Sequence, residues 1–370
     1  MNNLIYQSLA VGFKTVVVFL FFYLVNRDLS TLETSIIISE FTFASILSVI
    51  ICFGFDYSFI QESKLKIDLN SFIIKITIGI IISVIIILIQ KLNFYILFYA
   101  ISLAFALMFK GYIRFSKKHK LDCIVNLITL FLFCNIVFFL NVETSKYLLA
   151  LSFCFFIIHG IALFWQMKFT RHFHLDNIIN SVSSSAPLMF YGLISYLLLN
   201  IDVYFFDYLD KLESYSAFAI SNKFFMNLTM VAAVLSNYRI SSIFKSNNDD
   251  RFLKEFILLG FLLSIFTYLF SDKILLILLS GEIVLNKIEI LIFSIIVLIR
   301  CINTYYSVKI LQLINNWKRL YIMLTTVTVH CIFLFILIEK FDWQGALYSN
   351  LLSILLLTAI NYYFVKTSKK

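Results

Sequence analysis

The sequence is poor in the residues that build turns and phosphate-binding loops. Its 370 residues include one proline, Pro187, and nine scattered glycines, so a Gly-rich phosphate loop is excluded. Charged residues make up only 14% of the chain. No stretch is long and polar enough to fold as a separate soluble domain.

The side chains that usually carry enzyme chemistry are also sparse and unsuitably spaced. None of the six cysteines belongs to a Cys-x-x-Cys pair, and none of the five histidines to a His-Glu-x-x-His motif. No nucleophile stands at a diagnostic spacing from a base. These absences argue against covalent catalysis and nucleotide hydrolysis, so we expect no enzyme chemistry of these kinds, no metal site and no bound cofactor.

Hydrophobic residues are what the sequence has in excess. They make up 61% of the chain, 42 of them are phenylalanine, and the mean hydropathy is +0.94. A soluble domain is only about half apolar. Apolar runs of roughly 20 residues recur, each long enough to cross a bilayer. The sequence predicts an all-α polytopic membrane protein with no removable leader and twelve spans: Ser8–Val25, Ser35–Ile60, Phe72–Ile89, Phe94–Phe109, Leu121–Leu140, Tyr147–Met167, Pro187–Phe206, Tyr215–Phe244, Phe252–Phe270, Ile288–Leu311, Leu320–Ile338 and Ala346–Val365.

The distribution of lysine and arginine predicts the orientation of these spans. When the chain starts in the cytoplasm, seventeen of these residues fall in inside loops and tails and seven in outside loops. Cytoplasmic loops carry such an excess. Both termini are therefore predicted to be cytoplasmic. The net charge of +9 follows from topology and does not imply a nucleic-acid partner.

Two six-helix bundles are expected, residues 1–174 and 175–370. The longest inside connection, Lys168–Ala186, divides the chain almost in half. The turn Leu29–Thr34 also resembles the turn Leu209–Ser214, which lies 180 residues later, with three identities in six positions. Repeated halves with a site between them are common in transporters. Within the connection, Leu175–Val182 fits either an interfacial helix or a plain linker.

Six basic residues lie inside the expected spans, in two groups. Lys75, Arg239 and Lys309 lie near span ends, where their side chains can reach the headgroups. The other three lie about 9, 12 and 18 Å from the ends of their spans, at 1.5 Å per residue. Cations at such depth persist only where they face a wet cavity or have a partner. This second group and a neighbouring amide are the predicted lining of a substrate cavity: Lys14, Lys223, Arg300 and Asn222.

Two carboxylates lie at related depths. Asp202 is within a lysine's reach of Lys223, and either forms a structural ion pair with it or tunes an anion path. Glu40 lies five residues into the second span and is either solvated or a proton or cation site. Both carboxylates are candidates for charge tuning or ion coupling. A proton or sodium gradient would then drive transport.

Several motifs along the chain fit one transporter family. They include a Pro-Leu span opening, a mid-helix Asp and a turn leading into Tyr-x-x-Ala, although Ser214 stands where the family usually has glycine. The segments that carry them are Gly12–Lys14, Phe53–Asp56, Gln61–Glu62, Ser185–Leu188, Asn200–Asp202, Glu213–Ala217, Ser221–Lys223 and Ile338–Ala346. Together they resemble Wzx-type polysaccharide flippases, which handle O-antigen or capsule repeat units and belong to the MOP (MATE-like) exporter superfamily.

This resemblance implies a substrate and its surroundings. The substrate would be an undecaprenyl-pyrophosphate-linked oligosaccharide repeat unit, moved from the inner to the outer leaflet of the bacterial inner membrane. The cavity cations would bind the pyrophosphate while the lipid tail stays among membrane lipids. Polymerase and chain-length proteins of the same pathway would be further partners.

Other functions remain open alternatives. A polysaccharide repeat-unit polymerase would be an enzyme, but such polymerases usually carry a long outside loop, which is not expected here. A MATE-like cation-coupled exporter of small molecules would use Glu40 and Asp202 for coupling. A structural or lipid-scrambling membrane protein is the least specific alternative.

Overall fold

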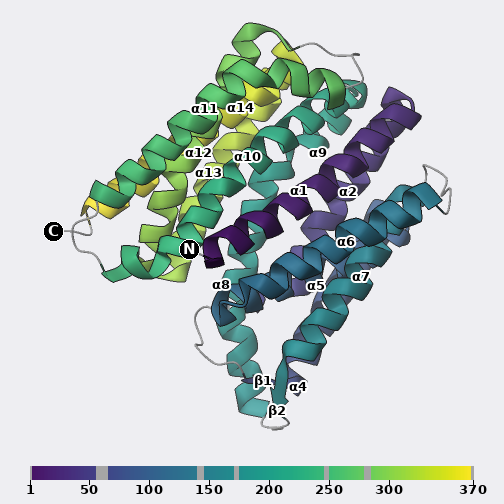
Figure 1. Ribbon diagram of the computed structural model, residues 1–370, viewed down its shortest axis with the longest axis vertical. Helices are drawn as coiled ribbons and strands as arrows, with labels where there is room; N and C mark the ends of the chain where they lie inside the picture. The colour runs from purple at the N-terminus through teal and green to yellow at the C-terminus, as the bar shows by residue number, and fades with distance from the viewer. Residues whose placement is uncertain are drawn as a thin grey trace. The chain divides into compact units, whose positions relative to one another are not determined.

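The computed structural model describes residues 2–55, 66–139, 146–170, 175–245, 250–278 and 285–367. Within these ranges the chain forms thirteen helices and two three-residue strands (Figure 1). Eleven helices are long and apolar enough to cross a membrane, and a twelfth span results if the bent pair α8 and α9 counts as one. The predicted all-α polytopic fold is confirmed. The helices are α1 (Asn2–Asp28), α2 (Thr31–Cys52), α4 (Leu69–Gln90), α5 (Tyr95–Ser116), α6 (His119–Phe139), α7 (Tyr147–Gln166), α8 (Leu175–Asn200), α9 (Asp202–Tyr208), α10 (Leu212–Lys245), α11 (Asp250–Leu278), α12 (Lys287–Leu313), α13 (Asn316–Phe341) and α14 (Trp343–Thr367).

The helices group into two compact units. Unit 1 comprises Met1–Phe21 and Ser39–Leu197, and unit 2 comprises Phe22–Ile38 and Leu198–Lys370. Helices α1, α2 and α8 each run from one unit into the other. The division into bundles 1–174 and 175–370 stays a prediction.

Aromatic side chains pack the helices of unit 1. Both α5 and α6 contact α7. The rings of Phe98 and Phe105 on α5 lie 5.3 and 5.6 Å, centre to centre, from the ring of Phe156 on α7. The strands β1 (Lys66–Asp68) and β2 (Lys168–Thr170) pair in parallel and join two connections expected on the cytoplasmic side.

Unit 2 is built around its last helices. Helix α12 packs against α11 and α14, and α13 packs against α14 (Figure 1). Phe225 of α10 stacks on Phe293 of α12 with ring centres 4.0 Å apart. Gly260 of α11 allows close approach to α12, because a Cβ there would lie only 3.0 Å from the Cβ of Cys301. Small and aromatic residues thus set the spacing of this unit.

The seventh predicted span is a broken helix. Helix α8 starts at Leu175, so the segment Leu175–Val182 is the beginning of that helix and not a separate interfacial one. The chain continues as a helix through Pro187 and bends by 53° at Ile201, between α8 and α9. Asn200 and Asp202 flank the bend. Both residue types favour helix ends, because their side chains compete for backbone hydrogen bonds.

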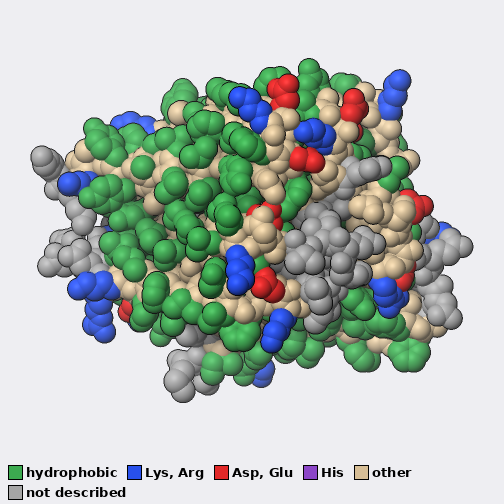
Figure 2. Space-filling view, turned by 90° about the horizontal axis from the view of Figure 1, so that it is seen from above, with side chains coloured by type: hydrophobic (Ala, Val, Ile, Leu, Met, Phe, Trp, Pro, Cys, Tyr) green, Lys and Arg blue, Asp and Glu red, His purple; other side chains and the backbone are tan. Residues whose placement is uncertain are grey.

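The surface carries more exposed hydrophobic side chains than a protein in water usually does. Figure 2 shows hydrophobic side chains over much of the visible face. On α11, Leu258, Phe261 and Leu262 are 61%, 55% and 57% exposed. Large exposed apolar surfaces mark contact with lipid or protein. The pattern agrees with membrane-spanning helices, while the cytoplasmic position of both termini stays a prediction.

Candidate functional site

A buried polar cluster in unit 2 begins at the break between α8 and α9. Asn200 and Asp202, which flank the break, are 4% and 5% exposed. The Nζ of Lys223, on α10, donates a hydrogen bond to Asn200 Oδ1. The break therefore gives an acceptor to a lysine that would be costly in a membrane without one.

Arg300 of α12 joins this cluster through two amides. Its Nη2 donates to Asn350 Oδ1 of α14 at 2.8 Å, and Asn350 Nδ2 donates to Asn222 Oδ1 of α10 at 3.3 Å. The two amides are buried, whereas Lys223 and Arg300 are partly exposed. The amides thus orient the two cations, neither of which is fully buried as a residue.

The cluster carries more positive than negative charge. Asp202 interacts electrostatically with Lys223 and Arg300. Among the residues that the structure describes, it forms no ion pair with either cation, so the predicted direct pair is absent. One carboxylate facing two cations leaves one net positive charge. Arg and Lys donate charge-assisted hydrogen bonds to oxyanions, so the arrangement suits an anionic ligand.

His330 is a member of this neighbourhood that the sequence analysis missed. It lies on α13, is 2% exposed, and its Nδ1 is 2.8 Å from Ser353 Oγ of α14. The ring interacts electrostatically with Arg300. The signal that points to it is a histidine in the middle of an apolar span.

Two of the predicted site residues lie in unit 1. Lys14 of α1 interacts electrostatically with Asp122 of α6. Glu40 of α2 is 8% exposed and accepts hydrogen bonds from Tyr95 Oη and, at 3.1 Å, from Asn93 Nδ2. The alternative of a solvated Glu40 is therefore wrong. Its role as a proton or cation site stays a prediction.

Two lysines expected to reach the headgroups are instead buried in protein. Lys75 of α4 is 2% exposed, donates to Ser185 Oγ of α8 at 2.7 Å and lies 4.9 Å from the ring centre of Phe55. Lys309 of α12 is 5% exposed and donates to the carbonyl oxygen of Ile243 at 3.0 Å. Specific acceptors on neighbouring helices hold both, so the interfacial prediction is wrong for these residues.

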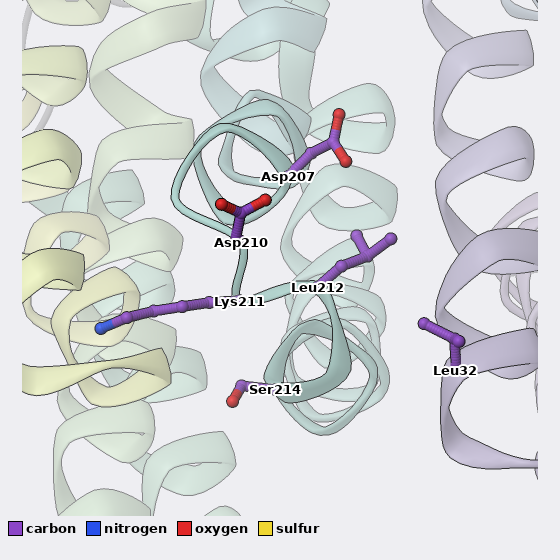
Figure 3. Close-up of a pocket in the computed structure, with 6 residues that line it drawn as sticks. All are labelled: Leu32, Asp207, Asp210, Lys211, Leu212 and Ser214. Atoms are coloured by element: carbon purple, nitrogen blue, oxygen red, sulfur yellow. The ribbon is translucent and has the colours of Figure 1, made fainter.

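Unit 2 also contains a cavity of about 360 Å³ at the turn between α9 and α10 (Figure 3). Leu32 and Leu212, which occupy equivalent positions in the two related turns, both line it. The Lys211 side chain is bound to the end of α13, where its Nζ donates to the carbonyl oxygens of Ile338 and Glu339 at 2.8 and 3.2 Å. The remaining lining residues are Asp207, Asp210 and Ser214. The two carboxylates make this cavity a poor anion site, so the cluster around Arg300 is the better candidate.

No family model and no curated protein matches the sequence. Solved structures match it by fold. A MOP superfamily transporter from Pyrococcus furiosus has a TM-score of 0.60 and 11% identity, over 100% of this chain and 96% of its own. A eukaryotic MATE transporter has a TM-score of 0.57 and 12% identity, over 99% and 94%. A Vibrio cholerae MATE transporter, crystallised as a point mutant, has a TM-score of 0.55 and 12% identity, over 99% and 96%.

The chain has a MATE-like fold. Its apolar helices and these structural neighbours indicate a multi-pass membrane protein. Identities of 11% and 12% show the fold alone. In the part of this MATE-like chain that the structure describes, no three His, Cys, Asp or Glu side chains converge on a metal position.

Proposed function

We propose that this MATE-like protein is a flippase in the bacterial inner membrane. Its cargo is an undecaprenyl-pyrophosphate-linked oligosaccharide repeat unit for O-antigen or capsular polysaccharide synthesis. The observation that carries the proposal is the cationic cluster of unit 2, in which Lys223 and Arg300 outweigh Asp202.

The chemistry of the cluster suits both parts of such a head group. Pyrophosphate needs charge-assisted donors, which Lys223 and Arg300 offer. Sugar hydroxyls need neutral donors and acceptors, which the amides of Asn200, Asn222 and Asn350 offer. A head group that crosses hydrocarbon without such partners loses several kcal/mol for each unpaired polar group. The lipid tail has no such need and stays in the bilayer.

The polarity of the cluster is the criterion that favours a flippase over a drug exporter. For the Pyrococcus furiosus transporter, the reverse polarity of the binding pocket suggests a different function. In this chain the net positive cluster favours an anionic cargo, since like charges repel a cationic drug.

A cation-coupled exporter of small molecules is the second candidate. One structural neighbour is a multidrug resistance MATE transporter in an outward-facing conformation. The buried Glu40, held by Tyr95 and Asn93, is a carboxylate that can take up a proton or a sodium ion. Ion coupling through this residue would also serve a flippase driven by a proton or sodium gradient.

A deletion strain tests the proposal. Its lipid-linked sugars are extracted, and a membrane-impermeant lectin or glycosidase reports which leaflet holds the single repeat units. We expect them on the cytoplasmic face. Single units on the outer face would indicate a lost polymerase instead. A strain with normal polysaccharide and increased drug sensitivity would support the exporter.

Variants tie the activity to the cluster. Lys223→Ala should reduce surface polysaccharide by roughly tenfold or more, because a charge-assisted bond to the cargo is lost. Asp202→Asn should be milder, because both cations remain. Lys287→Ala, which removes an exposed lysine at the start of α12, is the control and should behave as wild type. Membrane levels are measured by immunoblot for each variant. Normal polysaccharide in Lys223→Ala cells would contradict the role of the cluster.

A further inference from the structure

Two buried side-chain nitrogen atoms in unit 2 make no hydrogen bond with the residues that the structure describes. They are Nε of Arg300 and Nε2 of His330. Buried polar groups are almost always hydrogen-bonded, and an unmet donor is costly. Arg300 and His330 interact electrostatically, and their hydrogen-bond partners, Asn350 and Ser353, lie three residues apart on α14.

One face of α14 positions both side chains. Asn350 accepts the hydrogen bond from Arg300 Nη2 at 2.8 Å, and Ser353 lies 2.8 Å from His330 Nδ1. Residues three apart on a helix lie on the same face, one turn from each other. A single turn of α14 therefore orients the guanidinium of α12 and the imidazole of α13.

The guanidinium geometry shows what the site can accept. The Nε–H and Nη2–H bonds of an arginine lie along one edge and together fit two oxygens of a carboxylate or phosphate. In this structure the amide oxygen of Asn350 accepts from Nη2 alone, so this edge is only half used. An oxyanion on the same edge would replace the amide oxygen and also satisfy Nε.

We propose that the Nε–Nη2 edge of Arg300 and the Nε2 of His330 form a subsite for one oxyanion of the phosphate or carboxylate class. Asn350 is the neutral acceptor that the oxyanion replaces. The ring of His330 contacts the Ser353 hydroxyl through Nδ1 and also hydrogen-bonds to the backbone of Ser349. His330 therefore donates from Nε2 to the oxyanion when both of its ring nitrogens are protonated, and the bound anion stabilises that imidazolium. Arg300 as a residue is only partly buried, so the subsite is not sealed within the helix packing. This subsite deepens the proposed function and rests on it only for the identity of the cargo.

Asn350→Asp is the sharpest test, because it separates binding from folding. A carboxylate at this position keeps an acceptor on Arg300 but does not yield to an incoming anion, and it gives up the hydrogen bond that Asn350 donates to Asn222. Sodium pyrophosphate and sodium glucuronate are titrated into the detergent-purified full-length protein by calorimetry. We expect the wild type to bind at least one of them, and Asn350→Asp to bind it at least tenfold more weakly while the variant still melts in a single cooperative transition.

Substitutions at two separate histidines, His330 and His119, supply the second test and its control. His330→Leu should weaken the same ligand by roughly tenfold, and His330→Gln should restore part of the affinity, because its amide also donates. His119 of unit 1 is also buried and lies 3.1 Å from Gln7 Nε2. His119→Leu should therefore leave the affinity unchanged.

The outcomes separate this inference from the proposed function. Tighter binding of pyrophosphate assigns the subsite to a phosphate group, and tighter binding of glucuronate assigns it to an acidic sugar. Wild-type affinity in folded Asn350→Asp protein, or no binding of either anion by the wild type, overturns the subsite. Variant-sensitive binding in a protein whose deletion strain makes normal polysaccharide keeps the subsite and overturns the flippase.

Discussion

At the scale of single residues, three lysines inside the membrane spans share one property. Each of them donates a hydrogen bond to a neutral acceptor: Lys223 to an amide, Lys75 to the Ser185 hydroxyl and Lys309 to a backbone carbonyl. A neutral acceptor satisfies a donor without neutralising its charge. Where such a cation is partly exposed, as Lys223 is, the charge remains available to a ligand. Where it is buried, as Lys75 is, the contact joins helices.

The Lys75 contact between α4 and α8 gives a residue-scale prediction. Ser185→Ala removes an acceptor from a buried ammonium group and should cost about 1–3 kcal/mol of stability. Lys75→Met in the Ser185→Ala background should recover most of that loss, because no buried charge remains. The melting temperature of the purified protein, followed by tryptophan fluorescence, measures both. A double variant that is less stable than Ser185→Ala would contradict a mainly electrostatic contact.

The sequence predicted the charged residues of the candidate site and one of its amides, but not the whole network. Asn222, Lys223, Asp202 and Arg300 all stand out as polar residues inside apolar spans, and the structure brings all four together in unit 2. The network also needs Asn350 of α14. Asn350 belongs to the network because of which faces of α10, α12 and α14 pack together. The spacing of apolar residues in the sequence does not determine that packing.

At the scale of elements, apolar runs predict helices well and their ends less well. The sixth span was predicted at Tyr147–Met167, and α7 occupies Tyr147–Gln166. The break at Ile201 was not predicted, because a 20-residue apolar run gives no sign of a bend. Turns depend on single close contacts, as the connection of α13 to α14 shows. There Asp342 has a φ of 55°, and a Cβ on Gly345 would overlap the carbonyl oxygen of Leu337.

Gly345→Ala tests this turn. The added methyl group must push the start of α14 away from α13, so we expect a loss of about 1–3 kcal/mol. Gly12→Ala is the matched control, since no atom lies within 4 Å of a Cβ at Gly12 of α1. That change should be neutral or stabilising by about 0.5–1 kcal/mol, because alanine favours a helix over glycine. Equal melting temperatures for Gly345→Ala and wild type would contradict the close approach.

At the scale of the whole molecule, one of two global sequence patterns has a counterpart in the structure, and the other has to be tested in the membrane. The first is the similarity between two turns that lie 180 residues apart. Leu32 and Leu212, from equivalent positions in these turns, line one cavity in unit 2 (Figure 3). The excess of lysine and arginine in alternate loops predicts how the protein is oriented in the membrane. Contacts within the protein do not show that orientation. Orientation therefore follows from charge alone and has to be measured in cells.

Reporter fusions test the orientation with both termini in the cytoplasm. Green fluorescent protein fused after Lys370 should fluoresce, because it folds in the cytoplasm and not after export through the general secretion pathway. Alkaline phosphatase should be active when fused after Lys91, in a turn expected outside, and inactive after Lys117, in a turn expected inside. These two lysines are a matched pair, since each directly follows the last residue of a helix and has a positive φ, 53° and 55°. The seventeen-to-seven distribution of basic residues requires this alternation to hold through the last span. Phosphatase activity at Lys117 or at the C-terminus would mean an odd number of spans before that point and would reverse the side from which the cluster in unit 2 meets its cargo.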